Sequence, residues 1–243
     1  GGNLFSYDKN GFETNIKYAS VSKRMSKGED ETYINEHDLK NVKTIEKFTD
    51  EYERIKENCF RYSGVEAVGV SGVCEKYSYV KANSKIVVLD VETSFESIGA
   101  KAERRQDRID LLLLDKRKNI LRFYEAKHYS NSEIWSKEGS RPKVVKQISK
   151  YNKQVKGKKT QIIEAYNTYT DIVNTLFDLK LNKIDTVDLN VYLLIFGFDR
   201  DQLNGRLQRL IKRDKSLEGI YVYPIGSVSS LRNDNLWKCP RKY

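Results

Sequence analysis

The spacing of apolar residues changes several times along the chain, and each change marks a predicted element. Runs rich in β-branched and aromatic residues predict strands, because such side chains pack well on a pleated surface. These runs span residues 85–95, 107–115, 119–127, 187–198 and 219–226. Residues 65–82, which are rich in Val, Tyr and Gly, also predict one or two strands. The run at 187–198 is the most apolar, so we expect it in the centre of a sheet.

Apolar residues at spacings of three and four predict helices. The predicted helices span residues 44–63, 142–156, 160–181 and 201–213. A narrow apolar seam along the second of them consists of Val144, Ile148, Tyr151 and Val155. Ser140 is a candidate cap for this helix, and Pro142 is tolerated in its first turn. The predicted elements follow the order helix, strands, helix, strand, helix, strand. This order is typical of an α/β fold with a central mixed β-sheet flanked by helices.

The N-terminal part of the chain has a different composition from the rest. Residues 1–43 are polar and predict an extension, with a hairpin around Asn10-Gly11 that we expect to pack on the core. Residues 44–243 predict one larger domain. Gly1-Gly2 without an initiator Met resembles a cleavage scar, which leaves open whether the chain is a fragment of a larger protein.

The chain is basic. Its 44 Lys and Arg against 34 Asp and Glu give a formal net charge of +10. Such an excess suits a partner that carries many phosphates, because cationic side chains release condensed counterions on binding. A lysine-rich protein with solvated charges is the alternative, so charge alone does not decide for nucleic acid.

Cysteine and histidine content restricts the metal chemistry and the compartment. Cys59, Cys74 and Cys239 are widely spaced, which argues against a disulfide framework and a zinc knuckle and favours a reducing, cytoplasmic setting. With only 2 His in the chain, a catalytic metal would be held mainly by carboxylates, which favours Mg²⁺ or Mn²⁺. No apolar run reaches membrane-spanning length and no signal peptide opens the chain, so no membrane partner is expected.

Acidic and basic residues stand on two neighbouring predicted strands. Residues two apart in a strand share a face, so Glu125 and Lys127 in FYEAK point the same way. Asp110 in DRIDLLLLD lies among leucines, where a carboxylate costs several kcal/mol unless it is paired or bound to a metal. Two carboxylates from adjacent strands and a backbone carbonyl can hold Mg²⁺ against a phosphate, and a lysine can orient the attacking water. A chance Glu-x-Lys in a chain rich in both residues is the competing interpretation.

The predicted helix at 142–156 adds a second group of candidates. Gln147 lies on the boundary between the apolar seam and a lysine-rich face, one turn before Tyr151. The lysines beside it include Lys143, Lys146 and Lys150, which we expect to contact a nucleic-acid backbone. A solvated lysine face with a core tyrosine remains the alternative.

Taken in order, these residues resemble the PD-(D/E)xK nuclease superfamily, in particular its RecB-like branch with a Q-x-x-x-Y motif. The matching residues are Asp110 in RID, Glu125 and Lys127 in EAK, and Gln147 with Tyr151 in QISKY. The resemblance implies a restriction-endonuclease-like core within residues 44–243, and a DNA-cleaving, metal-dependent activity.

By this resemblance, Asp110 and Glu125 bind one or two Mg²⁺ or Mn²⁺ ions together with the carbonyl of Ala126. Lys127 serves the nucleophilic water, and the glutamine and tyrosine of the motif contact DNA near the cut. Ile109 stands where the superfamily name has Pro. A further acid from the first helix is expected, and the candidates are Glu51, Glu46 and Glu53.

We therefore predict a hydrolase that cleaves DNA phosphodiesters, and family analogy suggests an effector of antiviral defence or repair. A non-catalytic nucleic-acid-binding module on the same fold, an RNA-directed nuclease and a basic scaffold protein are the alternatives. Strandedness, endo or exo action, target sequence, homo-oligomerisation and a regulatory partner domain stay open. Outside the motif, Trp135 is a candidate for stacking on a base. Basic residues before Asp110 and on the last predicted helix either line a groove that follows the nucleic-acid backbone or are solvated. They are Arg104, Arg105, Arg108, Arg206, Arg209, Lys212 and Arg213.

Overall fold

The protein's structure is a computed structural model. It describes residues 6–8, 11–13, 53, 57, 63–78, 84–95, 108–136, 140–212, 216–232, 235–237 and 241–242. The chain divides into two compact units, Gly1–Val68 and Gly69–Tyr243. In the first unit, strands β1 (Ser6–Asp8) and β2 (Gly11–Glu13) pair antiparallel, as predicted around Asn10-Gly11.

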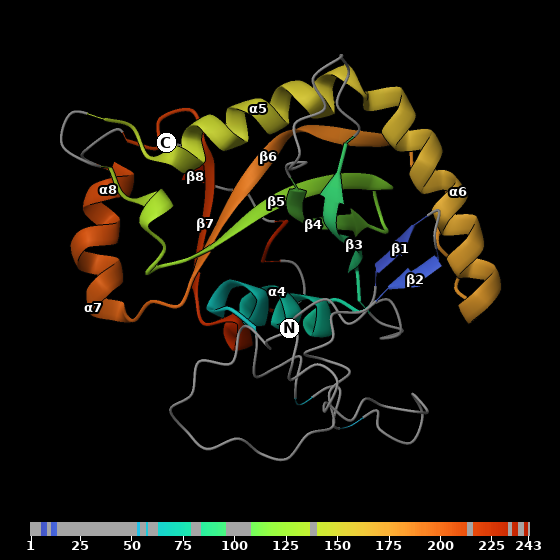
Figure 1. The fold of residues 1–243 in the computed structure, drawn as a ribbon, viewed down its shortest axis with the longest axis horizontal. Helices are drawn as coiled ribbons and strands as arrows, with labels where there is room; N and C mark the ends of the chain where they lie inside the picture. The colour runs from blue at the N-terminus through green and yellow to red at the C-terminus, as the bar shows by residue number, and fades with distance from the viewer. Residues whose placement is uncertain are drawn as a thin grey trace, which may run out of the picture. The chain divides into compact units, whose positions relative to one another are not determined.

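The second unit is built on a six-stranded sheet with the order β3-β4-β5-β6-β7-β8 (Figure 1). The strands are β3 (Ile86–Ser94), β4 (Arg108–Asp115), β5 (Ile120–His128), β6 (Thr186–Phe196), β7 (Tyr221–Gly226) and β8 (Arg241–Lys242). Strands β3, β4 and β5 pair antiparallel with one another, strands β5, β6 and β7 pair parallel, and β8 pairs antiparallel with β7. The sheet is therefore mixed and flanked by helices, which confirms the predicted α/β class. Strand β5 is the place where the sheet changes from antiparallel to parallel pairing.

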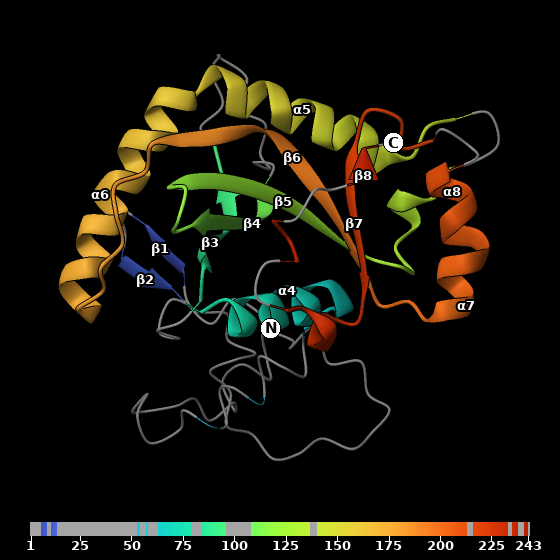
Figure 2. The same cartoon turned by 180° about the vertical axis from the view of Figure 1, so that it is seen from behind.

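Both faces of this sheet are apolar, which explains why its central strands lack a simple alternation of polar and apolar residues. One face carries side chains such as Leu112, Phe123 and Leu193 and packs against helices α5 (Lys143–Gly157) and α6 (Lys159–Phe177). The other face packs against helix α4 (Val65–Lys76) through Val73. Figure 2 shows α5 and α4 on opposite sides of the strands.

Helices α5 and α6 agree with the sequence prediction within a few residues. The predicted seam of α5 is buried, with Val145 in addition, and Pro142 rather than Ser140 occupies the cap position. Helix α6 is fixed to β3 by Tyr166, whose hydroxyl donates to Asp90 Oδ2 at 2.6 Å. Burial, followed by the nearby carboxylate of Asp90, raises the pKa of Tyr166, so this hydroxyl keeps its proton. Within the described ranges, no helix is long and apolar enough to cross a membrane.

The prediction of strands at 65–82 is wrong for residues 65–76, which form helix α4. Gly69, Val73 and Tyr77 recur at the helical spacing of four, and Val73 and Tyr77 are fully buried. Gly69 is required for close packing, because a Cβ there would lie 2.1 Å from the ring of Phe196. Tertiary packing on a glycine face thus overrides the strand propensity of the valines. The first predicted helix, 44–63, lies largely outside the described residues.

The late helix is present but broken into three parts. Its segments are α7 (Arg200–Gln202), a π-helical turn η2 (Leu203–Leu207) and α8 (Gln208–Lys212). Asp199 caps it, because the Asp199 side chain accepts from the Gln202 amide and the Gln202 side chain accepts from the Asp199 amide.

Candidate functional site

The strand ladder between β4 and β5 opens at the position of the predicted catalytic residues. Paired residues run from Asp115 opposite Ile120 to Leu111 opposite Tyr124. Continuing this register by one residue places Asp110 opposite Glu125. Beyond that position β4 pairs only with β3, and β5 pairs only with β6, within the described residues. The two strands therefore part at the positions of Asp110 and Glu125.

Asp110 bridges this opening with its side chain. The half-buried carboxylate accepts a hydrogen bond through Oδ2 from the amide of Ala126, at 2.7 Å. In an extended strand, the N–H and C=O of one residue point to the same side. The carbonyl of Ala126 therefore faces the same opening as Asp110, as expected for a ligand contributed by the backbone.

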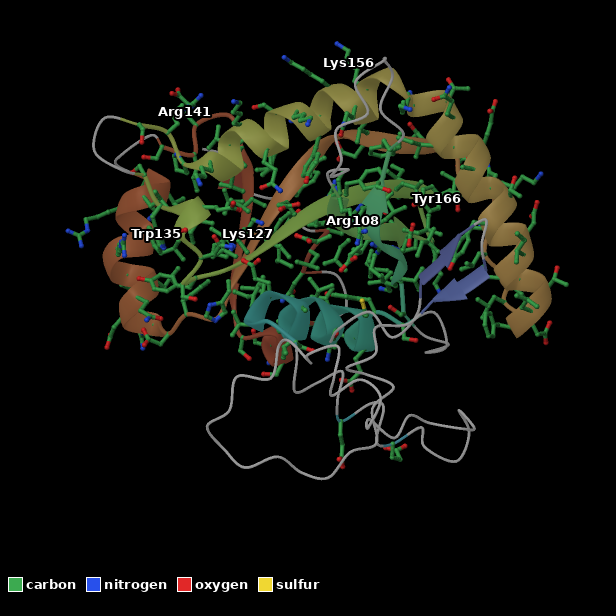
Figure 3. The ribbon with its side chains drawn as sticks, viewed as in Figure 1. Arg108, Lys127, Trp135, Arg141, Lys156 and Tyr166 are labelled. Atoms are coloured by element: carbon green, nitrogen blue, oxygen red, sulfur yellow. The ribbon has the colours of Figure 1, made fainter. Side chains whose placement is uncertain are left out.

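Glu125 and Lys127 share the face of β5 that α5 covers, because they alternate with Phe123 of that face. They are 1% and 7% exposed. Lys127 Nζ lies 2.8 Å from Glu125 Oε1, and the second oxygen of Glu125 is buried as well. Figure 3 shows Lys127 near the carboxyl end of the strand. Buried charges of this kind persist only when they are paired, so the pair is a built feature of the fold.

A residue that the sequence analysis missed completes this cluster. Glu133 Oε2 lies 3.3 Å from Lys127 Nζ, so the ammonium sits between two carboxylates. Glu133 belongs to η1 (Ser132–Ile134), a short 3₁₀ turn in which Asn131 Oδ1 accepts from the amide of Glu133. In the sequence, the available signal for this turn was Asn131, because asparagine often caps the start of a helical turn and Glu133 follows two positions later.

The Gln-x-x-x-Tyr pair of α5 is connected to the start of β4. Gln147 Nε2 donates to the hydroxyl of Tyr151 at 3.0 Å, and that hydroxyl donates to the carbonyl of Arg108 at 2.8 Å. Tyr151 is buried, whereas Gln147 is half-buried. The pair therefore holds the strand two residues before Asp110, and Gln147 is its outward member. The predicted contact lysines of α5 are exposed, and they are Lys143, Lys146 and Lys150.

Glu92 is a second acid that the sequence analysis missed. Val91 opposes Leu111 and Thr93 opposes Ile109, so Glu92 stands at the β3 position next to Asp110. Its backbone is left-handed, with φ 52°, a conformation that is uncommon for a residue other than glycine. Its carboxylate lies 2.7 Å from Arg108 Nη1 in an exposed ion pair. Glu46 and Glu51 lie outside the described residues, and Glu53 belongs to the first unit.

These oxygen donors fit a hard divalent cation. Asp110, Glu125 and the carbonyl of Ala126 are the ligand types that Mg²⁺ and Mn²⁺ accept, and Mg²⁺ usually keeps several waters besides one or two carboxylates. Across the described ranges, no three His, Cys, Asp or Glu side chains cluster closely enough to hold a metal by themselves. The site thus offers two carboxylates and a carbonyl, beside an ammonium.

Comparison of the chain with protein-family models, curated proteins and solved structures finds no match.

Proposed function

We propose that this protein is a Mg²⁺- or Mn²⁺-dependent nuclease that hydrolyses DNA phosphodiesters on a restriction-endonuclease-like core. The observation that carries the proposal is the opening between β4 and β5. There the Asp110 carboxylate accepts from the Ala126 amide, next to Glu125, and Lys127 lies buried on the same face as Glu125. The ordered motif that resembles PD-(D/E)xK nucleases supports the same function, and the basic net charge of +10 suits a polyanionic substrate.

The residues divide the chemistry between them. Asp110, Glu125 and the Ala126 carbonyl would hold the ion, which supplies Lewis acidity and a lowered pKa for a bound water. Lys127 orients the water or neutralises charge that builds on the phosphate. Glu133 also pairs with Lys127, so it would hold the ammonium in place if Glu125 served as a metal ligand. Tyr151 acts as a positioning residue through Arg108, and Gln147 faces the nucleic acid.

One observation favours a second candidate, a nucleic-acid-binding module that does not cleave. Lys127 Nζ already neutralises Glu125 at 2.8 Å, and this arrangement also suits a site without a metal. Such a module would bind nucleic acid in EDTA with salt-sensitive affinity and would yield no product with any metal.

A cleavage panel decides between these functions. Linear, circular, single-stranded and double-stranded DNA and RNA are incubated with Mg²⁺, Mn²⁺ or EDTA, using wild type, Asp110→Asn and Lys127→Ala. We expect metal-dependent DNA cleavage that falls about 100-fold or more in both variants, because each loses a group that stabilises the transition state. Lys118→Ala, at the exposed turn between β4 and β5, is the control and should cleave like wild type. Full activity in both site variants would falsify the assignment, and cleavage of RNA alone would reassign the substrate.

A further inference from the structure

The broken late helix contains a pocket on the side opposite its apolar contacts. Leu207, Leu210 and Ile211 bury the inner side of this segment. Gly205 leaves helical geometry, with φ −89° and ψ −108°, in the middle of the π-helical turn. The break opens a cavity of about 290 Å³, lined by Asn204, Gly205, Gln208, Arg209 and Lys212. Irregular turns of this kind inside helices are frequent at functional sites.

The chemistry of this pocket suits an anion. Its lining combines two cations, Arg209 and Lys212, with two amide side chains, and the described lining contains no carboxylate. With its amide oriented to satisfy both neighbours, Gln208 donates to the carbonyl of Asn204 at 3.0 Å and accepts from Lys212 Nζ at 2.9 Å. An ammonium carries three N–H donors, so this bond fixes Lys212 and still lets it donate to a ligand.

A chain of contacts connects the pocket segment to the candidate site. Arg206, next to Gly205, places its guanidinium 3.9 Å from the centre of the Trp135 ring. The indole N–H of Trp135 donates to the carbonyl of Tyr129 at 3.0 Å, and Trp135 directly follows the turn that carries Glu133. Figure 3 shows Trp135 between Lys127 and the late helix. Trp135 is therefore engaged by Arg206, and the late helix is held beside the carboxyl end of β5.

We propose that this pocket binds a backbone phosphate of the nucleic acid, at a position other than the one that is cut. The identity of the polymer rests on the proposed function. The charge of the segment supports this role, because Arg200, Arg206, Arg209 and Lys212 stand against Asp201 alone. A strand with its reactive phosphate at Lys127 would pass Trp135 and reach the pocket with a further phosphate. The pocket adds affinity and fixes the direction of the strand without taking part in the chemistry.

The test measures binding rather than cleavage. The binding of Asp110→Asn protein to labelled single-stranded and duplex DNA is followed by fluorescence anisotropy in EDTA, over a series of salt concentrations. In this background, Arg209→Ala/Lys212→Ala should bind about tenfold more weakly at low salt, and its log–log salt slope should fall by about 1, because one phosphate contact is lost. Both residues are exposed, so the urea unfolding midpoint should stay unchanged.

Lys116→Ala/Lys118→Ala is the matched control, since it removes two charges at the turn between β4 and β5 and should leave the slope unchanged. An equal loss in this control would mean that bulk charge, not the pocket, determines affinity, and the proposal would fail. A slope in the pocket variant equal to that of the parent protein would also overturn it.

A calorimetric titration with inorganic phosphate tests whether the pocket binds free phosphate instead of a phosphate of the nucleic acid. Saturable phosphate binding that the pocket variant loses, without any change in DNA binding, would assign the pocket to free phosphate. Because cleavage is not measured, a failure here leaves the proposed nuclease untouched.

Discussion

Strand β5 carries two cations, Arg122 and Lys127, and the charges that surround them differ in their balance. Arg122 faces the side of the sheet that α4 covers, whereas Lys127 faces the side that α5 covers. Arg122 lies between the rings of Tyr192 and Trp237, with its guanidinium carbon 4.3 Å from each ring centre. Its guanidinium also lies 3.2 Å from Asp188 Oδ2.

The Arg122 cluster is balanced in charge. One guanidinium faces one carboxylate, and Asp188 Oδ2 also accepts from the hydroxyl of Tyr192 at 2.6 Å. The hydroxyl of Tyr124 and the guanidinium of Arg122 both donate to the carbonyl of Leu236. These contacts tie the segment around Trp237 to the sheet. Such a cluster has an evident structural role.

The Lys127 cluster gathers more carboxylates than ammonium groups. Glu125 and Glu133 both pair with Lys127, and Asp110 lies on β4 one residue beyond the pair of Leu111 and Tyr124. Like charges held close together cost free energy unless a cation joins them. The difference teaches that the two buried cations of β5 differ in charge balance: the charges around Arg122 cancel, whereas Lys127 has an excess of carboxylates, as the proposed metal site requires.

The largest expected difference is in the free energy of unfolding, when one charged residue is replaced in each of the two clusters of β5. Arg122→Met should lower the free energy of unfolding by about 3 kcal/mol, because it leaves Asp188 without its cation. Glu125→Gln should change this free energy by less than about 1 kcal/mol, because Glu133 still pairs with Lys127. It should abolish cleavage, because it removes a proposed metal ligand. Urea unfolding and cleavage assays of the folded fraction measure both effects. A Glu125→Gln protein destabilised as much as Arg122→Met would remove the distinction between the two clusters.

Metal binding should also distinguish the Lys127 cluster from the Arg122 cluster, with a somewhat smaller effect on the free energy of unfolding. Mn²⁺ at about 100 times its Kd should raise the free energy of unfolding by about 2.7 kcal/mol, since the ion binds only the folded site. Arg122→Met should keep this increment, whereas Asp110→Asn/Glu125→Gln should lose it. Unfolding curves recorded with Mn²⁺ and with EDTA give the result. An increment that survives in the double variant would place the ion elsewhere.

The smallest effect concerns alkaline pH and the Arg122 side alone. Burial raises the pKa of Tyr124 well above its ordinary value, and burial with the Asp188 hydrogen bond also raises the pKa of Tyr192. The unfolded chain therefore loses these protons first, so stability is full below pH about 10 and falls as the pH rises above it. For Tyr124 the loss is about 1.4 kcal/mol per pH unit. Tyrosinate absorbance and far-UV circular dichroism should change together for this group, and Tyr124→Phe should reduce the dependence. Ionisation of Tyr124 in a chain that stays folded would contradict the expectation.

The strands were predictable from sequence because their apolar runs are continuous and long. The burial of Glu125 and Lys127 on one face of β5 was predictable from their spacing of two, whereas their role in cleavage stays a prediction. Helix α4 was mispredicted because its Gly69 packs against Phe196, far along the chain, and local propensity carries no record of that contact.

The remaining features depend on partners that sequence does not reveal. Arg122 looks like a solvated residue in its strand, yet its contacts come from Asp188 and Leu236, 66 and 114 residues further on. Glu133 reaches Lys127 only because η1 turns back over the end of β5. The pocket at Gly205 requires a break in a helix whose apolar periodicity is uninterrupted.

The contacts of Leu236 also bear on how the protein is made. Strand β5 is synthesised more than one hundred residues before the segment that accepts the hydrogen bond from Tyr124, as their separation of 112 positions shows. A chain emerging from the ribosome therefore holds Arg122 and Tyr124 without their final partners until translation has passed Leu236. The strand that bears Glu125 and Lys127 reaches its finished packing only at that stage. The order of synthesis thus delays completion of the sheet around the candidate site.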